Sequence, residues 1–481
     1  MTGRVTPAAD DGSMTQEPDY DVVVIGAGGA GLAAAVSAAE AGASVLVTEA
    51  ADKPGGSTAL AGGSFMAAGT SVQAAAGYPG DTADALFDYY LTFNRWDVEP
   101  AVARRFCHEA LPTFEWLTGL GVRFVPEGLY RAGREPAPRS HRPVGGGQAY
   151  VDALYRAARS HGLDFAFGQR ADRLDIDAGG RCHRVSAGGE EVTGGSVVLA
   201  TGGFGANLEL IRRHIPDADG ELAWSPAAGG CRGDGLALAL SAGAEAAGIN
   251  HGDLLLTAGL VKEIEPFVPP WLMMVGKHGH RFVDESAPYG VVTPLALKHG
   301  PCWVILDDRL VRSAQPDPAS AWGAGTWTAD SLMPAIADGR VLQAGTIEEL
   351  AAAAGLPGRA LAGSVRRYNQ SCASRHDAEF LKREAGLIAI GTPPYYAVRL
   401  RPAVVALTGY GPRIDAEARV LRAADGDPVP GLYAAGEVTG NVLGPQYLGG
   451  GNAIGSALIF GRIAGRSAAA ARQAVAAGAA R

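Results

Sequence analysis

Short apolar runs that end in or near glycine recur along the chain and predict buried parallel strands. The first is the valine-rich segment 21–25, and the second is "ASVLVTE", which ends at Glu49. The alanine-rich segment 32–41 between them has the composition of a helix. "SVVLATGGFG" at 196–205 and "PGLYAAGEVTG" at 430–440 repeat the pattern of a strand that enters a glycine turn. Continuous apolar strands are typical of parallel sheets covered on both faces, so the pattern predicts an α/β fold.

The turn after the first strand has a specific glycine spacing. Gly26, Gly28 and Gly31 stand in the GxGxxG arrangement, and Glu49 closes the second strand. In a dinucleotide-binding turn the first glycine permits a tight bend. The second lets a pyrophosphate approach the helix N-terminus, whose free N–H groups attract anions. The acid accepts hydrogen bonds from ribose hydroxyls. A chance glycine turn is the alternative, but the complete order of strand, turn, helix, strand and acid favours a dinucleotide site.

A second glycine-rich stretch, "AADKPGGSTALAGGSF" at 50–65, follows almost at once. It suits a cofactor that extends past the pyrophosphate to a ring system, so the sequence favours FAD over NAD. Residues 55–58 are expected to line the phosphates and the flavin. Glu437, at the tip of the late strand-and-turn motif, is expected to bind the hydroxyls of the ribityl chain.

Composition and charge narrow the classes of function. The 481 residues carry a net charge of -9 and 47% hydrophobic residues, a balance typical of soluble proteins that argues against nucleic-acid or anionic-membrane partners. Five scattered cysteines form no CxxC pair, so no metal site is expected, and a reducing cytoplasm is the expected location. No apolar run reaches the ~20 residues of a membrane helix. Residues 1–18 lack the apolar core of a secretory signal and are expected to form a disordered tail.

The motifs, taken in order, resemble the flavoproteins of the fumarate reductase and 3-ketosteroid dehydrogenase superfamily, from Asp19 to about Ala469. The resemblance implies a discontinuous Rossmann-like FAD-binding domain, formed by 19–252 and 401–481. It implies a smaller α+β catalytic and capping domain, inserted at 253–400. The implied cofactor contacts are Gly26, Gly28, Ala30, Gly31, Glu49, Ala50, Gly55, Gly56, Ser57, Thr58, Gly62, Gly63, Ala171, Ala200, Thr201, Gly202, Asp234, Gly436, Glu437, Asn452, Ala453 and Ile454.

One of these positions bears on how the cofactor is held. Succinate dehydrogenases of the superfamily attach FAD covalently through a histidine, and "STALAGG" matches their attachment segment with Ser57 at the histidine position. The resemblance therefore implies non-covalent FAD. Asp234 has two interpretations, because it could lie near the FAD phosphates or cap a helix as an Asx turn.

The positions that bind substrate in fumarate reductases are changed in this chain. Those enzymes hold a dicarboxylate with arginines and donate a proton from another arginine. In "RFVDESAPYG" at 281–290 the position of the donor arginine holds Tyr289. In "PQYLGGGNA" the position of a carboxylate-binding arginine holds Tyr447, and a substrate-contacting histidine falls on Leu407. A buried carboxylate without cationic partners is costly, so succinate and fumarate are not the expected substrates.

The same segments resemble the 3-ketosteroid 1-dehydrogenases, which carry a segment close to "RFVDESAPY" and a tyrosine–glycine loop like "YLGGG". The resemblance implies that the Tyr447 hydroxyl and the Gly451 N–H polarise a ketone oxygen, as in an oxyanion hole. Tyr289 would accept the proton from the adjacent carbon, the flavin would take the hydride from the next one, and Tyr130 would assist. The substrate would be a hydrophobic ketone, with a steroid as one candidate, and the external electron acceptor is not specified.

Several alternatives stay open at this point. Tyr289 and Tyr447 could be packing residues, because buried tyrosines often fill space with the ring and anchor only the hydroxyl. The reaction could also run as the reduction of an activated alkene. A flavin-binding protein without turnover is the alternative of another class, although it gives no reason for two phenols at the arginine positions.

Overall fold

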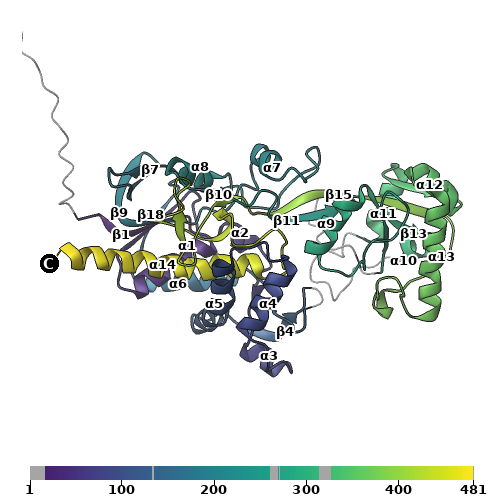
Figure 1. Cartoon of the computed structure of the whole chain (residues 1–481), viewed down its shortest axis with the longest axis horizontal. Helices are drawn as coiled ribbons and strands as arrows, with labels where there is room; N and C mark the ends of the chain where they lie inside the picture. The colour runs from purple at the N-terminus through teal and green to yellow at the C-terminus, as the bar shows by residue number, and fades with distance from the viewer. Residues whose placement is uncertain (1–16, 133–134, 261–268, 270, 314–326, 480–481) are drawn as a thin grey trace, which may run out of the picture.

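The computed structural model describes residues 17–132, 135–260, 269, 271–313 and 327–479 (Figure 1). The expected tail at 1–18 therefore lies outside the described residues except for its last two positions. Figure 1 shows a larger lobe that contains both the start and the end of the described chain, and a smaller lobe connected to it by long strands.

An eight-stranded sheet forms the centre of the larger lobe, with the order β17-β18-β9-β1-β2-β6 and with β7 and β8 attached beyond β9. The four pairs from β18 to β6 are parallel. Val24 pairs with Val47 on one side and with Val198 on the other. The strands are β1 Tyr20–Ile25, β2 Val45–Glu49, β6 Asp164–Phe167, β7 Ala171–Ile176, β8 Cys182–Ala187, β9 Glu190–Leu199, β17 Arg419–Leu421 and β18 Pro428–Ala434.

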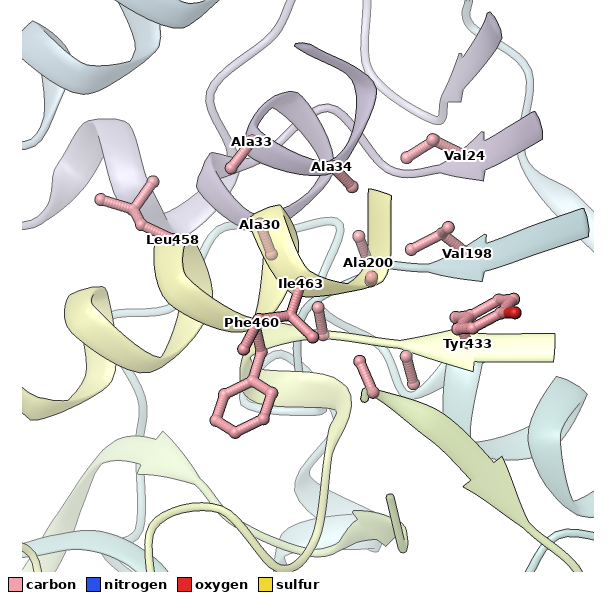
Figure 2. Packing of buried hydrophobic residues seen from close by; sticks show 14 of the residues in the cluster. Val24, Ala30, Ala33, Ala34, Val198, Ala200, Tyr433, Leu458, Phe460 and Ile463 are labelled. Carbon is pink, nitrogen blue, oxygen red and sulfur yellow. The ribbon is translucent and has the colours of Figure 1, made fainter. Parts of the chain in front are cut away.

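Helix α1 (Gly29–Glu40) packs against this sheet and against the long C-terminal helix α14 (Asn452–Ala479), which also contacts β9, β18 and β1. Figure 2 shows Ala30, Ala33 and Ala34 of α1 facing α14. Two glycines of α14 permit this contact. A Cβ on Gly461 would lie 2.4 Å from the Ala30 carbonyl oxygen, and one on Gly465 would lie 2.1 Å from that of Ala34. Small residues on both helices therefore bring the two backbones together and seal one face of the sheet.

The smaller lobe has its own hydrophobic core around a second sheet, with the order β11-β15-β13-β12 and with β14 paired to β15. Its strands are antiparallel. The elements are β11 Gly252–Thr257, β12 Met273–Val275, α9 Tyr289–His299, β13 Cys302–Asp307, α10 Asp308–Ser313, α11 Ala329–Ala337, β14 Val341–Ala344, α12 Ile347–Ala354, α13 Gly358–Ser374 and β15 Tyr395–Thr408.

Strands β11 and β15 run from one lobe to the other (Figure 1). The predicted fold class, a Rossmann-like α/β fold with an inserted smaller α+β unit, is confirmed. The proposed domain limits at 252/253 and 400/401 fall inside β11 and β15 and stay a prediction.

The remaining elements cover the larger lobe. They are α2 Gly56–Leu60, β3 Phe65–Met66, α3 Ser71–Ala75, α4 Ala83–Phe93, α5 Pro100–Gly119, β4 Phe124–Tyr130, β5 Ser140–Pro143, α6 Gln148–Ser160, α7 Leu208–His214, α8 Asp234–Ser241, β10 Ala246–Ala247 and β16 Gly411–Pro412. Strands β3, β5 and β4 form a small antiparallel sheet that carries Tyr130 at its end.

We expect Gly465→Ala to lower the free energy of unfolding by about 1–3 kcal/mol, because the added methyl group overlaps the Ala34 carbonyl unless the helices separate. Helix propensity alone would predict that Gly465→Ala raises the free energy of unfolding. Denaturant unfolding followed by circular dichroism measures the change. Gly119→Ala is the control, since Gly119 is exposed on α5 with no atom within 4 Å of its added Cβ. A Gly465→Ala variant as stable as wild type would contradict the close packing.

Candidate active site

A cavity of about 770 Å³ lies where the parallel strands end. Ile25, Glu49, Ala200 and Ala435, at or just beyond the carboxyl ends of β1, β2, β9 and β18, line it on the larger lobe. It continues to β11 and β15 of the smaller lobe. The carboxyl edge of an open parallel sheet is the usual ligand site of such folds.

The glycine turn after β1 is a close-packed cradle. Gly26 has a φ of +107°, and a Cβ there would lie 2.4 Å from the Ala200 carbonyl oxygen. A Cβ on Gly31 would lie 1.8 Å from the Gly26 oxygen. Gly31 is not among the residues that line the cavity, so the structure shows its packing role, and its contact with a cofactor stays a prediction. Gly28 is the N-cap of α1 and does line the cavity, which brings the helix N-terminus to the site.

Glu49 is held in a fixed orientation by backbone donors. Its carboxylate accepts hydrogen bonds from the N–H of Ala27 at 2.6 Å and of Ala51 at 2.8 Å. It links the glycine turn to the segment after β2 while still lining the cavity. The arrangement fits a carboxylate that accepts hydrogen bonds from the ribose hydroxyls of a dinucleotide.

The second glycine-rich stretch forms the next part of the wall. Ser57 Oγ accepts a hydrogen bond from the Ala228 N–H at 3.1 Å and lies 3.3 Å from Cys231 Sγ. Asp234 lies in the first turn of α8, where Gly233 is the N-cap, and it pairs with Arg170. The Asx-cap interpretation of Asp234 is therefore wrong, since its carboxylate is engaged by a guanidinium. Arg170 and Cys231 also line the cavity, and the sequence reasoning did not find them.

Glu437 lines the cavity just after β18. Its Oε1 accepts hydrogen bonds from Thr408 N at 2.9 Å and Thr408 Oγ1 at 2.8 Å. Burial raises the pKa of its carboxyl. Glu437 thereby ties the end of β15 to the larger lobe.

Most of the expected cofactor contacts are brought together by the fold. Asn452 is fully buried at the start of α14 and, like Gly31, is not part of the cavity lining. The expected residues that do line it are Gly26, Gly28, Ala30, Glu49, Ala50, Gly55, Gly56, Ser57, Thr58, Gly62, Gly63, Ala171, Ala200, Thr201, Gly202, Asp234, Gly436, Glu437, Ala453 and Ile454. These residues are mostly small, and they lie beside the N-terminus of α1 in a cavity of about 770 Å³. These features fit the binding of FAD.

Three tyrosines gather at the end of the cavity that faces the smaller lobe, and we call Tyr130, Tyr289 and Tyr447 the phenol cluster. The rings of Tyr289 and Tyr447 are stacked, with centroids 5.9 Å apart and an interplanar angle of 27°. Tyr289 is the first residue of α9. Their backbones also meet, because a Cβ on Gly290 would lie 2.1 Å from the Tyr447 carbonyl oxygen.

Tyr447 is oriented by the N-terminus of α14. Its phenol oxygen accepts a hydrogen bond from the Ala453 N–H at 3.3 Å, so its own proton can be donated into the cavity. Burial, and then the nearby Asp253, raise its pKa above the usual value. Burial likewise raises the pKa of Tyr289, followed by the effects of Tyr447 and Asp253. Both phenols are therefore kept protonated and suited to donate hydrogen bonds.

Tyr130 and Gly451 complete this end of the site. The Tyr130 hydroxyl is 2.8 Å from Ser64 Oγ, and a Cβ on Gly450 would lie 2.1 Å from it. Gly451 has a φ of +101°, and its carbonyl accepts from Met66 N at 3.1 Å. All four expected catalytic residues, Gly451 included, thus border one cavity.

Asp253, on β11, is a residue that the sequence reasoning missed. It lines the cavity beside Leu255, Ala406 and Leu407 and is only 8% exposed. Its Oδ1 accepts no hydrogen bond from the described residues. Burial raises its pKa from 3.8 to about 8. The sequence does carry a signal, an acid at the start of the apolar segment "DLLLT". That segment was interpreted only as the start of the inserted domain.

Comparison with known proteins agrees with this geometry. The model of a family described as "FAD binding domain" matches residues 21–454. The chain belongs to this family. The expected cofactor contacts that line the cavity all fall within the matched segment, and FAD is the cofactor that the family implies.

Two curated relatives have the names of fumarate-converting enzymes. The chain is 30% identical over 477 residues to the NADH:fumarate oxidoreductase of Klebsiella pneumoniae (strain 342), covering 96% of this chain and 49% of the relative. It is 32% identical over 463 residues to a Fumarate reductase (cytochrome) of Shewanella frigidimarina, covering 93% and 77%. This FAD-binding chain thus spans about half the length of the first relative and about three quarters of the second.

A solved structure of a ketosteroid dehydrogenase is also similar to this chain. The 3-ketosteroid-Δ4-(5α)-dehydrogenase of Rhodococcus jostii RHA1, in complex with 4-androstene-3,17-dione, is similar with a TM-score of 0.79 and 30% identity. The match covers 95% of this chain and 98% of that one. The predicted membership of the fumarate reductase and 3-ketosteroid dehydrogenase superfamily is confirmed, and with it the class of FAD-dependent oxidoreductases that act on carbon–carbon bonds.

Within the described part of the chain, no helix is both long enough and apolar enough to cross a bilayer.

We expect Glu49→Ala to weaken FAD binding more than it changes the rate of flavin reduction in protein that retains FAD. The carboxylate fixes two backbone turns and is expected to bind the ribose of the cofactor, away from the reacting ring. Titration of apoprotein with FAD, followed by flavin fluorescence, measures the affinity. Asp52→Ala, an exposed acid three residues on, is the control and should bind as wild type. Equal affinity in Glu49→Ala would remove Glu49 from the site.

Proposed function

We propose that the protein is an FAD-dependent dehydrogenase that introduces a carbon–carbon double bond next to a ketone. The observation that supports this most strongly is the phenol cluster, which meets the end of the cavity in place of cationic side chains. Among the described residues of the lining, the cations are Lys53, near the second glycine-rich stretch, and Arg170, which pairs with Asp234.

The electrostatics of this end argue against a dicarboxylate substrate. A carboxylate placed beside Tyr289 and Tyr447 would be desolvated by Leu255 and Leu407 and would face the carboxyl of Asp253. A buried anion needs a cation or several donors to offset the cost of desolvation. A ketone needs only hydrogen-bond donors, and the phenols supply them.

In this proposal each residue at this end of the cavity has a separate role in the reaction. The Tyr447 hydroxyl and the Gly451 N–H donate hydrogen bonds to the ketone oxygen and stabilise the negative charge that develops there. This makes the neighbouring C–H more acidic. Tyr289 receives the proton, and the apolar wall keeps water away from the reacting carbons. Bound FAD supplies the acceptor for the hydride that leaves the adjacent carbon.

The similar proteins support a ketone as the substrate. Whether the reaction runs as desaturation or as alkene reduction is a question for experiment. A steroid-like ketone is favoured by the structural similarity to a dehydrogenase solved with 4-androstene-3,17-dione. Alkene reduction is the second candidate, because the curated relatives carry the names of fumarate reductases. The five cysteines are free thiols, and the cytoplasmic location expected from them stays a prediction.

We expect FAD to be held without a covalent bond. Ser57 occupies the position of the attachment histidine, and its hydroxyl is engaged by Ala228 and Cys231. Acid precipitation of the yellow protein should release all of the flavin into the supernatant, where its absorbance is measured. Flavin that stays with the washed, denatured protein would contradict this.

We expect Tyr447→Phe and Tyr289→Phe each to slow flavin reduction by a ketone on the order of a hundredfold, because one removes an oxyanion donor and the other removes the proton acceptor. Each variant loses one oxygen atom and should keep its FAD. Because the two groups act in one step, the double variant should lose less than the product of the two single effects. Anaerobic single-turnover measurements with a panel of steroid and non-steroid ketones and enones give these rates.

Tyr433→Phe is the matched control. Tyr433 is a buried tyrosine on β18 outside the cavity, and its loss of one oxygen should leave the rate unchanged. Near wild-type reduction in Tyr447→Phe would overturn the ketone-binding role. Failure of every ketone to reduce the wild-type flavin, with an enone reoxidising the reduced flavin, would select alkene reduction.

A further inference from the structure

The phenol cluster raises a question about the final destination of the proton. A phenol acts as a base only when it is ionised, and its ordinary pKa is about 10. Burial raises the pKa of Tyr289 and of Tyr447 instead of lowering it. Tyr289 can therefore accept a proton from carbon only if it passes its own proton to another group in the same step.

Asp253 is the group that the fold provides. It lies on β11, the strand against which the Tyr289 helix α9 packs, and it lines the same cavity as both stacked phenols. It is nine-tenths buried among Leu255, Ala406 and Leu407, with a carboxylate oxygen that no described residue satisfies. It is close enough to both phenols that its charge disfavours ionisation of either one.

The fold gains nothing from this placement. A buried polar atom without a hydrogen bond costs free energy, and an apolar residue at the same place in the strand would avoid that cost. Such groups persist where they serve a site. The proton that Asp253 takes up is thus expected to reach it from the side of the cavity, which Tyr289 also lines.

We propose that Asp253 is the final acceptor of the proton removed from the substrate carbon, with Tyr289 as the relay between them. This inference rests on the proposed desaturation of a ketone. The substrate C–H bond breaks as an O–H bond forms on Tyr289. The original Tyr289 proton forms an O–H bond with the Asp253 carboxylate. The C–H electron pair becomes part of the new carbon–carbon double bond, and the flavin is the two-electron oxidant for the hydride of the adjacent carbon.

The surroundings allow Asp253 to exist in both protonation states near neutrality. With its pKa raised to about 8 by burial, either state is accessible, as an efficient acid–base group requires. The titratable groups that face this end are Tyr289 from α9, Tyr447 from the loop before α14, Tyr130 from β4, and Glu135. Strand β15 presents only Ala406 and Leu407 to the cavity here. In alkene reduction the same carboxyl would return the proton.

The first experiment compares the pH dependence of anaerobic flavin reduction in wild type, Asp253→Asn and Asp253→Glu. Since the carboxylate is the accepting form, the wild-type rate should rise with pH and level off above about pH 8. Asp253→Asn should be slower on the order of a hundredfold and lack this inflection. Asp253→Glu should recover the inflection and part of the rate. Asp425→Asn, which removes an exposed acid far along the chain, is the control and should match wild type.

Two outcomes of that experiment would overturn the proposal. One is an Asp253→Asn variant with the wild-type rate and inflection. The other is a raised KM with an unchanged pH profile, which would assign Asp253 to substrate binding.

The second experiment needs no turnover, so it separates this inference from the proposed function. Infrared titration of the substrate-free holoenzyme should show a protonated carboxyl band that fades as the pH rises through about 8, and Asp253→Asn should lack it. A folded-state pKa above the unfolded value means that stability is lost as pH rises from about 4 to about 8. The melting temperature of Asp253→Asn minus that of wild type should therefore increase across this window. A carboxyl already ionised at pH 6, or a constant difference in melting temperature, would overturn the assignment even if no ketone is found.

Discussion

The contact between α1 and its neighbours is the constraint on which the site depends. Gly26 and Gly31 let the first turn of α1 close against the end of β9, and Gly461 and Gly465 let α14 lie against the other side of α1. The position of α14 in turn fixes where that helix begins. Its second residue, Ala453, donates its N–H to the Tyr447 hydroxyl. A chain of backbone contacts without large side chains therefore links the glycine turn after β1 to the orientation of a phenol that lines the cavity.

Low polarity governs the chemistry at the far end of the cavity. Burial raises the pKa of Tyr289 and of Tyr447, so these two phenols stay neutral, and it shifts the carboxyl of Asp253 toward its protonated form. In water the carboxyl would be fully ionised near neutral pH. Burial raises the pKa of the acid toward neutrality and keeps the phenols as hydrogen-bond donors. The same environment accepts a neutral ketone more readily than a carboxylate.

Much of the fold and of the cofactor cradle could be predicted from the sequence because the signals there are local. A glycine whose φ is positive, or whose Cβ would strike a backbone oxygen, has no substitute, so Gly26 and its spacing to Gly31, together with the flanking strands and Glu49, predict the turn. Gly31, expected to contact the cofactor, packs against Gly26 outside the cavity lining, and its cofactor contact stays a prediction. The spacing rule does not distinguish contact with a ligand from contact with the backbone. Arg170 and Asp253 could not be found in this way. Their importance comes from partners more than 30 positions away, brought together only by strand pairing and helix packing.

The division of the site between two hydrophobic cores has a consequence for how such a protein changes over time. Glu49 and the glycine cradle rest on the larger core, whereas Tyr289 and Asp253 stand on elements packed with the smaller one, and β11 and β15 connect them. Under the proposed function, substitutions in the smaller core would change which substrates fit the cavity and how the proton is transferred. They would leave the residues expected to bind the flavin unchanged. Selection can therefore act on the two halves separately. A lineage built on this architecture can acquire new substrates while inheriting its redox centre intact.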